Sequence, residues 1–422
     1  MQERPQEKNT AILITLKTPD LEFRQCDLYL DELQSLCNTL GIETLHRTVI
    51  PVRSLHPRFL VGSGKAEEIC SLAEEAQADC IIFDDTISPS QQRNLEQLSG
   101  RCVIDRQEVI LEIFSEHART KEAMLQVGLA RMEYSLPRLT RAWTHLSRQR
   151  GGMRGTRGEG ETQLEVDRRI VLKKITRLKK DLQKLEAQRH TRRKQRTGIP
   201  VPTGAIVGYT NAGKSSLLNA LTGADAAVED QLFATLDPTT RRMDLQGGAR
   251  VLLTDTVGFI RKLPHSLINA FHSTLEEAVV ADFLLHVLDA SNPEVEHHLE
   301  TTREVLTELE TGEIPTLLVF NKIDLCGEPY QLEHLKRSYP EALFISVKKE
   351  LGLVTLIASI EELIFRLAPL ARFRIPISRY DLAAELHRSG TVLEEKYEDS
   401  YVAIEARVPV RLKNKLADYL AV

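Results

Sequence analysis

Near its centre the chain reads Gly208-Tyr209-Thr210-Asn211-Ala212-Gly213-Lys214-Ser215. This stretch fits the phosphate-binding loop pattern, in which two glycines are followed by Lys and then by Ser or Thr. The residues before it, 203–207, predict a short buried strand, and 216–221 predict the start of a helix, which is the setting that the pattern requires. Backbone N–H groups between the glycines, at the positive end of the helix dipole, would surround a diphosphate. A glycine-rich turn before a helix is the alternative.

A second motif lies further along the chain, where Asp255-Thr256-Val257-Gly258 ends the apolar strand predicted at 250–254. A carboxylate at that strand end can hold Mg²⁺ through water, and the Gly258 N–H can face a γ-phosphate. In the loop itself, Lys214 is expected to reach the β- and γ-phosphates, and the Ser215 hydroxyl to join the Mg²⁺ shell.

A third motif, Asn321-Lys322-Ile323-Asp324, follows the apolar strand predicted at 316–320. The Asp324 carboxylate suits the N1–H and N2–H₂ edge of guanine, which adenine lacks. Asn321 can bond the purine and shape the loop, while the stem of Lys322 packs over the base. Ser346-Val347-Lys348 ends another strand, predicted at 342–345, and can offer a backbone N–H to guanine O6. Four signals in this order at strand ends predict a GTP-binding domain.

The composition is that of a globular protein with several domains. The chain has 422 residues, and its apolar content of 42% is ordinary, so two to four domains are expected. No apolar run reaches about 18 residues, so no membrane-spanning helix is predicted. The polar N-terminus argues against a secretory signal, and the six scattered cysteines predict buried thiols in a reducing compartment. We expect a cytoplasmic monomer and leave peripheral membrane association open.

Residues 1–120 predict a small parallel α/β domain, because strands at 11–16, 80–83 and 102–104 alternate with helices at 26–40, 65–76 and 89–98. Gly62-Ser63-Gly64-Lys65 lies between a strand and a helix. It lacks the full phosphate-loop spacing, so a turn that caps a helix is favoured over a phosphate contact. Asp84-Asp85 closes a strand, and a solvated acidic loop is favoured over a metal site.

Residues 121–198 predict an antiparallel helical hairpin, because apolar residues recur in two heptad seams. One seam contains Leu125, Leu129, Met132, Leu136, Leu139, Trp143 and Leu146; the other contains Val171, Ile175, Leu178, Leu182 and Leu185. Pro137 is expected to kink the first arm. The glycine-rich stretch 150–160 between the seams cannot stay helical and predicts a flexible tip.

Positive charge is concentrated in this hairpin. Residues 121–196 hold 21 Lys and Arg against 8 Asp and Glu, whereas the whole chain has a net charge of −5. Such a basic projection on an acidic protein indicates nucleic acid, and RNA is preferred because a narrow Gly/Arg tip suits folded RNA. A charged coiled coil that binds another protein is the alternative. The expected RNA-binding residues are Arg148, Arg150, Arg154, Arg157, Lys173 and Lys174.

Residues 199–368 are predicted to form the GTPase domain, which ends in a helix at 353–367. Residues 369–422 are predicted to form a small α+β domain. Strands at 373–377 and 401–408 and helices at 381–387 and 411–420 support that assignment. The fold class is therefore α/β and multidomain, with no chemistry visible in its last domain.

Several motifs, in this order, resemble the HflX family of translational GTPases. They are the stretch 89–96, Cys102-Val103-Ile104-Asp105-Arg106, Trp143-Thr144-His145-Leu146, Gly158-Glu159-Gly160-Glu161-Thr162-Gln163-Leu164-Glu165 and Phe233-Ala234-Thr235-Leu236-Asp237-Pro238-Thr239. The resemblance covers about residues 10–370. It implies a protein that binds the large ribosomal subunit, places its hairpin tip on ribosomal RNA and splits vacant or stalled ribosomes under stress. It also implies ATP binding through the N-terminal domain.

The resemblance further implies that Thr235 joins Mg²⁺ when GTP is bound. We then expect Lys214, Thr235 and Gly258 to act in catalysis, and Ser215, Thr235 and Asp255 to hold Mg²⁺. The residues expected to bind nucleotide (GTP or GDP) are Gly208, Tyr209, Thr210, Asn211, Ala212, Gly213, Lys214, Ser215, Ser216, Phe233, Thr235, Asp255, Gly258, Asn321, Lys322, Asp324, Ser346, Val347 and Lys348.

Three positions refine the expected mechanism. Phe259 follows Gly258 where many GTPases have a water-orienting Gln, so hydrolysis should be slow alone and need the ribosome or a rearranged switch. Val347 replaces the commoner alanine, with little effect expected because the base contact there uses backbone. Asn211 either ligates K⁺ or only stabilises the turn. GTP binding is expected to drive splitting, and hydrolysis to release the factor. A subunit-assembly GTPase and a signalling switch with a protein-binding hairpin are the alternatives.

Overall fold

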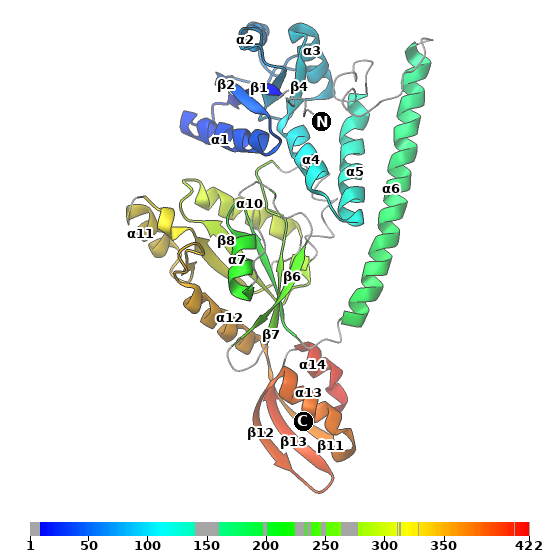
Figure 1. Cartoon of the computed structure of the whole chain (residues 1–422), viewed down its shortest axis with the longest axis vertical. Coiled ribbons are helices and arrows are strands. Elements are labelled where there is room, and N and C mark those ends of the chain that lie inside the picture. The colour runs from blue at the N-terminus through cyan, green and yellow to red at the C-terminus, as the bar shows by residue number, and fades with distance from the viewer. Residues whose placement is uncertain are drawn as a thin grey trace, which may run out of the picture. The chain divides into compact units, whose positions relative to one another are not determined.

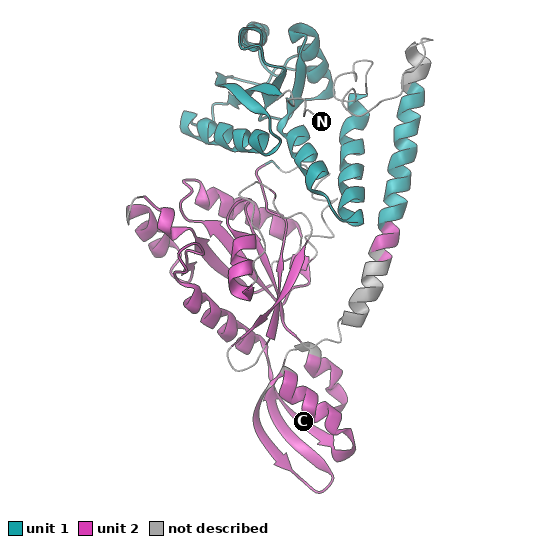
Figure 2. Cartoon of the chain, viewed as in Figure 1, with its two compact units in different colours: residues 1–182, 262–270 teal, residues 183–261, 271–422 magenta. Residues whose placement is uncertain are grey.

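The computed structural model describes residues 9–139, 160–196, 201–223, 233, 238–245, 250–262, 277–309, 311, 314–327, 329–408 and 410–421. The chain forms two compact units, one of residues 1–182 with 262–270 and the other of residues 183–261 with 271–422 (Figure 2). Each unit is described by itself.

The first unit contains a four-stranded parallel sheet in the order β2-β1-β3-β4 (Figure 1). Its strands are β1 (Thr10–Lys17), β2 (Glu43–Pro51), β3 (Cys80–Phe83) and β4 (Cys102–Asp105), and its helices are α1 (Phe23–Thr39), α2 (Ser63–Glu75), α3 (Pro89–Ser99) and α4 (Arg106–His117). The parallel α/β prediction is confirmed. We did not predict β2, an edge strand whose side chains are nearly all exposed or partly exposed, because such a strand carries no continuous apolar run.

Local sequence signals explain where the elements of this unit begin and end. The six central residues of β1 are buried, as expected for a strand covered on both faces. Helix α3 begins with a capping box between Ser88 and Gln91, has a proline in its first turn, and ends at Gly100 with a left-handed backbone (φ 65°).

The prediction of a solvated acidic loop at Asp84-Asp85 is wrong. Asp84 is fully buried and pairs with Arg106 at 3.0 Å and with Lys262, which belongs to the same unit, at 3.1 Å. Arg106 also pairs with Glu32 at 2.7 Å, and Lys262 with Asp85 at 2.7 Å. Cations that lie far away in the sequence compensate the buried carboxylate, which a strand-end motif alone cannot reveal. Among the described residues, no cluster of His, Cys, Asp or Glu is arranged to hold a metal.

The Gly62–Lys65 stretch forms the helix-capping turn that the sequence favoured. Gly62 is the N-cap of α2, and the Lys65 ammonium lies 2.6 Å from the carboxylate of Glu68. An open pocket beside Gly64 is lined by Glu67, Glu68 and Glu75 as well. Because these carboxylates repel phosphate groups, this turn gives no support to ATP binding.

The middle region is helical, with α5 (Lys121–Ser135), the 3₁₀ turn Leu136–Arg138 and α6 (Gly160–Arg196). Pro137 lies in the 3₁₀ turn that follows the end of α5, and the rest of the predicted first arm lies outside the described residues. On α6 the second seam is confirmed, because Ile175 and Leu182 are buried among exposed neighbours. The described residues of the first seam, among them Leu125 and Leu129, are only partly buried, and Ala123, Val127 and Ala130 belong to the buried face of α5 instead. Trp143 and Leu146 of that seam lie outside the described residues. The tip lies outside the described residues.

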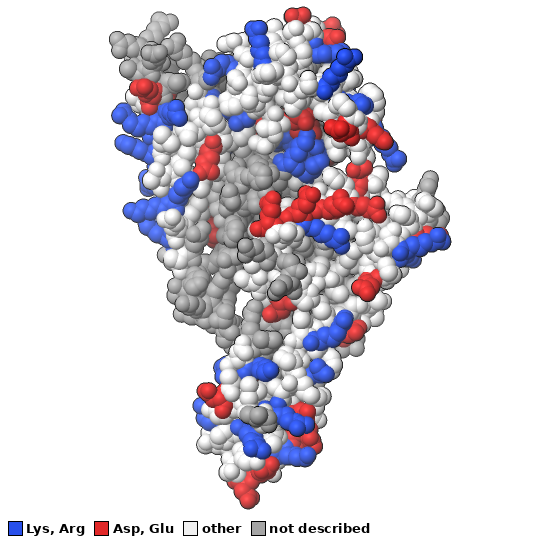
Figure 3. All heavy atoms as spheres, turned by 180° about the vertical axis from the view of Figure 1, so that it is seen from behind, with Lys and Arg blue, Asp and Glu red and all other residues white. Residues whose placement is uncertain are grey.

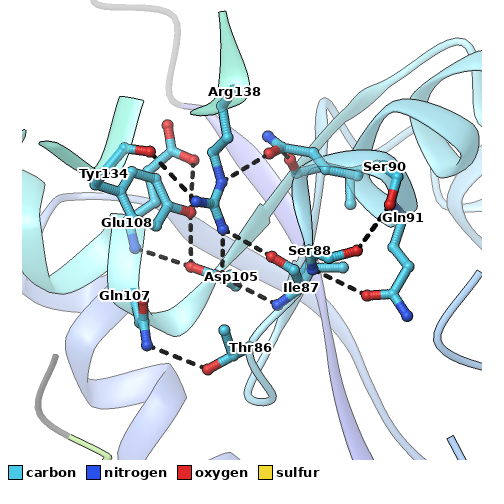
Figure 4. A network of polar contacts seen from close by, with 12 residues as sticks. Thr86, Ile87, Ser88, Ser90, Gln91, Asp105, Gln107, Glu108, Tyr134 and Arg138 are labelled. Atoms are coloured by element: carbon cyan, nitrogen blue, oxygen red, sulfur yellow. Dashed lines mark hydrogen bonds and ion pairs between the residues drawn. The ribbon is translucent and has the colours of Figure 1, made fainter. Parts of the chain in front are cut away.

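A polar network ties α5 and the 3₁₀ turn to the sheet (Figure 4). The buried Asp105 carboxylate accepts the Tyr134 hydroxyl at 2.9 Å and pairs with Arg138 at 3.4 Å. Arg138 also donates to the Ile87 carbonyl at 2.7 Å, and its guanidinium lies 3.7 Å from the centre of the Tyr134 ring. The network fixes the last described residues before the predicted tip to the α/β domain.

Glu108, at the edge of this network, gives the first unit a pH-dependent stability. Burial, and then the neighbouring Asp105, raise the pKa of Glu108 from 4.5 to about 7, against the opposing effect of Arg138. Below pH 4.5 the group is protonated in both the folded and the unfolded chain, so its raised pKa does not change the stability. As pH rises towards 7, the unfolded chain ionises more readily, so the folded state is increasingly destabilised. We expect Glu108→Gln to stabilise this unit at pH 8 by about 1–2 kcal/mol, because a neutral amide avoids the cost.

The measurement is hydrogen exchange of the β4 amides in the full chain at pH 5 and pH 8. Glu112→Gln, at a surface carboxylate that pairs with Arg131, is the control and should change little. A Glu108→Gln variant with the same pH dependence as the parent would contradict the argument.

The second unit contains a six-stranded sheet in the order β10-β9-β8-β5-β7-β6, in which only β6 is antiparallel. Its strands are β5 (Thr203–Gly208), β6 (Thr239–Asp244), β7 (Arg250–Asp255), β8 (Phe283–Asp289), β9 (Thr316–Asn321) and β10 (Leu343–Phe344), and its long helices are α7 (Lys214–Thr222), α10 (Val295–Glu308), α11 (Pro329–Ser338) and α12 (Leu353–Leu367). Strands β5, β8 and β9 run parallel, so their carboxyl ends meet at one edge of the sheet.

The C-terminal residues form a three-stranded antiparallel sheet in the order β11-β13-β12. Its elements are β11 (Leu370–Pro376), α13 (Tyr380–Ser389), β12 (Thr391–Tyr397), β13 (Tyr401–Arg407) and α14 (Val410–Lys415). The α+β prediction is confirmed, although β12 was missed.

Two predictions about the whole chain can be compared with the described residues. None of the described helices has the length and apolar content needed to cross a membrane. All six cysteines are free thiols; Cys26 and Cys37 are buried and the other four are partly exposed.

Candidate functional site

The phosphate loop connects β5 to α7 with a backbone that only glycine accommodates at its two ends. Gly208 has φ 146°, and a Cβ there would overlap the Val287 carbonyl oxygen. Gly213 has φ 90°, and a Cβ there would overlap the side-chain nitrogen of Asn321. The loop therefore packs against two neighbouring strands, and its N–H groups lie at the start of α7, where helices bind anions.

The two side chains that follow the loop face the carboxyl end of β7. Lys214 is 6% exposed and donates from Nζ to the Tyr209 carbonyl oxygen at 2.8 Å. Ser215 donates from Oγ to Oδ2 of Asp255 at 2.5 Å. Burial lowers the pKa of Lys214 to about 8, against the opposing effect of Asp255. Phosphate oxygens beside the ammonium would favour its charged form again.

The Asp255–Arg261 segment lies directly on the phosphate loop. Phe259 donates its N–H to Gly208 at 3.0 Å, and its carbonyl accepts the Thr210 N–H at 2.7 Å. A Cβ on Gly258 would lie 2.9 Å from the Lys214 ammonium, so Gly258 is in close contact with the loop. The Phe259 side chain is 1% exposed and belongs to the core. The structure therefore brings Ser215, Asp255 and Gly258 together beside Lys214.

The third motif closes the other end of the site. Asn321 donates from Nδ2 to the Ala212 carbonyl at 2.9 Å, and its Oδ1 accepts the Val347 N–H at 3.2 Å. The Ser346 hydroxyl donates to Oδ1 of Asp324 at 2.5 Å, which orients that carboxylate. Because Val347 acts through its backbone, its unusual side chain leaves these contacts intact. The exposed Lys348 follows directly.

Two features of the site were not found from the sequence. Asp289, at the end of β8, pairs with Lys322 at 2.8 Å and holds a residue whose backbone is left-handed (φ 62°). Tyr209 stacks on His298 of α10 and accepts the backbone N–H of Arg261 at 2.7 Å. The aspartate could have been suspected because β8, like β9, ends in a polar residue. Nothing in the sequence indicates the stack.

The remaining predicted site residues differ in what the structure describes. Phe233 is buried, with a left-handed backbone (φ 61°). Asn211 is exposed, with φ 57°. Thr235 and the tip arginines (Arg148, Arg150, Arg154 and Arg157) lie outside the described residues, whereas Lys173 and Lys174 are exposed on α6.

Comparison with known proteins gives three family matches along the chain. Residues 27–115 match the family described as GTP-binding GTPase N-terminal, residues 117–196 the GTP-binding GTPase middle region, and residues 203–322 the 50S ribosome-binding GTPase. These matches follow the order of the α/β domain, the helical region and the phosphate-loop domain.

Individual relatives extend the similarity over the full length. A GTPase HflX of Akkermansia muciniphila is 47% identical, with 100% of this chain and 99% of the relative covered. A GTPase HflX of Escherichia coli is 41% identical, with 90% of each covered. Among solved structures, a GTP-binding protein of the archaeon Sulfolobus solfataricus in complex with GDP is 26% identical, covering 84% of this chain and 98% of its own, with a TM-score of 0.43. On the identity and coverage of its full-length relatives, the chain belongs to the HflX family of GTPases.

Proposed function

We propose that this GTPase binds the large ribosomal subunit and splits vacant or stalled ribosomes into subunits under stress. The observation that carries the proposal is the match of residues 203–322 to the 50S ribosome-binding GTPase family, in a chain whose middle region is strongly basic. GTP occupancy would order the segments that contact the γ-phosphate, and hydrolysis would release the factor.

The nucleotide would lie across the carboxyl ends of the central strands. Its phosphates would contact the loop 208–216 and Lys214, with Mg²⁺ held by Ser215, Thr235 and, through water, Asp255. Guanine would be recognised by Asp324, with Asn321 and Lys322 shaping its pocket. Since the Val347 N–H already bonds Asn321, the neighbouring Lys348 N–H is our candidate donor to guanine O6. Magnesium is typical of phosphate-loop GTPases.

Hydrolysis is proposed to be slow without the ribosome. The Phe259 side chain has no polar atom and is buried in the core, so it cannot orient a water molecule. The ribosome or a rearranged switch would then supply that function. A K⁺ ligand role for Asn211 remains a proposal, because its left-handed backbone and exposed side chain suit either of its expected roles.

The basic middle region is the proposed RNA contact. Lys and Arg side chains gather along the exposed face of α6 (Figure 3), among them Lys173, Lys174 and Lys180, while Ile175 and Leu182 are buried. The cations thus face away from the protein core, where they can approach phosphates. Glu133 of α5 pairs with Lys179 at 2.8 Å and neutralises one charge near the buried face.

Sedimentation of purified ribosomes in sucrose gradients tests this function. With the protein and a non-hydrolysable GTP analogue, we expect the intact ribosome peak to be replaced by subunits, since binding and not hydrolysis is proposed to drive splitting. Binding to immature subunits only would indicate an assembly factor, and no co-sedimentation would indicate a signalling switch. Either result would contradict the proposal.

The four tip arginines provide a variant test. Changing Arg148, Arg150, Arg154 and Arg157 to alanine is expected to weaken large-subunit binding by about 100-fold or more. In a plot of log affinity against log salt concentration, the magnitude of the slope should fall by about three to four. The matched control replaces four exposed cations outside the middle region, Arg337, Lys349, Arg366 and Arg372, with alanine. Unchanged binding by the tip variant would refute the tip contact.

A further inference from the structure

Tyr209 is placed where three parts of the GTPase site meet. It is the second residue of the phosphate loop and is 5% exposed. Its carbonyl accepts the Lys214 ammonium at 2.8 Å, and its hydroxyl accepts the buried backbone N–H of Arg261 at 2.7 Å. Because Arg261 lies three residues beyond Gly258 in the segment that begins with Asp255, the tyrosine joins that segment to the loop at a point beyond Gly258.

The ring of Tyr209 is held by a second side chain. It stacks on the His298 ring of α10, with ring centres 3.6 Å apart and planes 5° from parallel. The stack leaves the ring little rotational freedom, so its hydroxyl is aimed at the Arg261 N–H. A buried N–H without a partner would be costly, and here a side chain, not a strand neighbour, supplies the acceptor.

The segment fixed in this way carries the groups that a γ-phosphate needs. Gly258 lies against the Lys214 ammonium, and Ser215 is already bonded to Asp255. In many GTPases the γ-phosphate itself orders this segment. In this chain, side chains of the protein hold it on the loop.

We propose that Tyr209, oriented by His298, is a positioning residue that presets the Asp255–Arg261 segment for the γ-phosphate. It therefore favours GTP over GDP. GDP contacts the loop, Lys214 and Ser215 but lacks the phosphate that Gly258 faces. Loosening the segment consequently weakens GTP and leaves GDP nearly unchanged. The inference rests on the GTP site alone and does not depend on the ribosomal function.

The test is the affinity of the full chain for GDP and for a non-hydrolysable GTP analogue, measured by calorimetry without ribosomes. Tyr209→Phe keeps the ring and removes only the acceptor. It should weaken the analogue about 5- to 30-fold, with GDP affinity changed less than about 2-fold. His298→Ala should also weaken the analogue more than GDP. His298→Phe keeps a stacking ring and should retain the preference for the analogue over GDP.

Tyr339→Phe is the matched control, because it removes a hydroxyl from the same sheet domain away from the loop. Its ring packs near Phe320, and it should leave both affinities unchanged. Hydrogen exchange at residues 258–262 should accelerate in Tyr209→Phe and not in the control. Equal weakening of GDP and the analogue would show a merely structural role and overturn the proposal, as would unchanged affinity for both. Failure of ribosome splitting would not affect this test.

Discussion

Replacing Asp324 with asparagine is expected to weaken GTP binding by about 100- to 1000-fold and to create a preference for xanthosine triphosphate. The carboxylate offers only acceptors to guanine, whose N1–H and N2–H₂ are both donors. An asparagine amide would set one donor against another, and each hydrogen bond to the charged carboxylate that is lost costs about 1.5–3 kcal/mol. Xanthine has a carbonyl at C2, which the amide N–H₂ can bond.

The geometry around Asp324 makes this change specific. Ser346 donates to Oδ1 of Asp324 and accepts the Lys349 N–H at 3.1 Å, so the side chain at 324 is held in one orientation. Competition binding of GTP and xanthosine triphosphate measures the effect. Asp244→Asn, at an exposed aspartate on β6, is the matched control. Equal losses for both nucleotides would show that Asp324 supports the fold instead of reading the base.

Replacing Arg106 with alanine is expected to destabilise the first unit by about 3–5 kcal/mol. Arg106 is 1% exposed and bridges the fully buried Asp84 and the partly buried Glu32. Removing the cation leaves Asp84 with its ion pair to Lys262 at 3.1 Å, and leaves a cavity where the arginine stem packed. The Asp84 carboxylate then stays buried with less compensating positive charge, so its desolvation destabilises the folded state.

Because the chain forms two units, its unfolding should not be treated as a single transition. Hydrogen exchange of the β3 and β4 amides reports on the first unit directly, and these amides should exchange about 100-fold faster or more in Arg106→Ala. The double variant Arg106→Met with Asp84→Asn removes both charges and should recover part of the loss. Arg131→Ala, which breaks a half-exposed pair with Glu112, should cost less than about 1 kcal/mol. An effect of Arg106→Ala no larger than that control would contradict the argument.

Prediction from the sequence was most accurate where a strong apolar run or a fixed motif defines the element. Strands β3 and β5 were recovered closely, and so was helix α12, because each combines a compact apolar pattern with clear end signals. Strand β2 was missed because its side chains are largely exposed, and β12 because three of its seven residues are charged. Edge strands of this kind are stabilised by pairing with a neighbour, which no local pattern records.

The same distinction applies to the site. Lys214, Ser215, Asp255 and Asp324 could be named as candidate site residues because their motifs lie at the ends of recognisable strands. Tyr209 was named only as a member of the loop, and its contacts with Arg261 and His298 were not foreseen. Those partners lie 52 and 89 residues away along the chain. The burial of Asp84 was not predicted for the same reason, because its partners Arg106 and Lys262 lie far away along the chain.

The sequence by itself determined that this protein has a GTPase domain with a phosphate loop, a basic helical middle region and three sheet-forming parts. These features depend on spacing and on apolar periodicity within about 20 residues, which local backbone geometry fixes. Only the tertiary structure decided which buried polar groups meet, as when Asn321 bonds Ala212 or Arg106 bonds Asp84. A buried charge or N–H must find a partner wherever the fold brings one, and that partner is chosen by packing and not by distance along the chain.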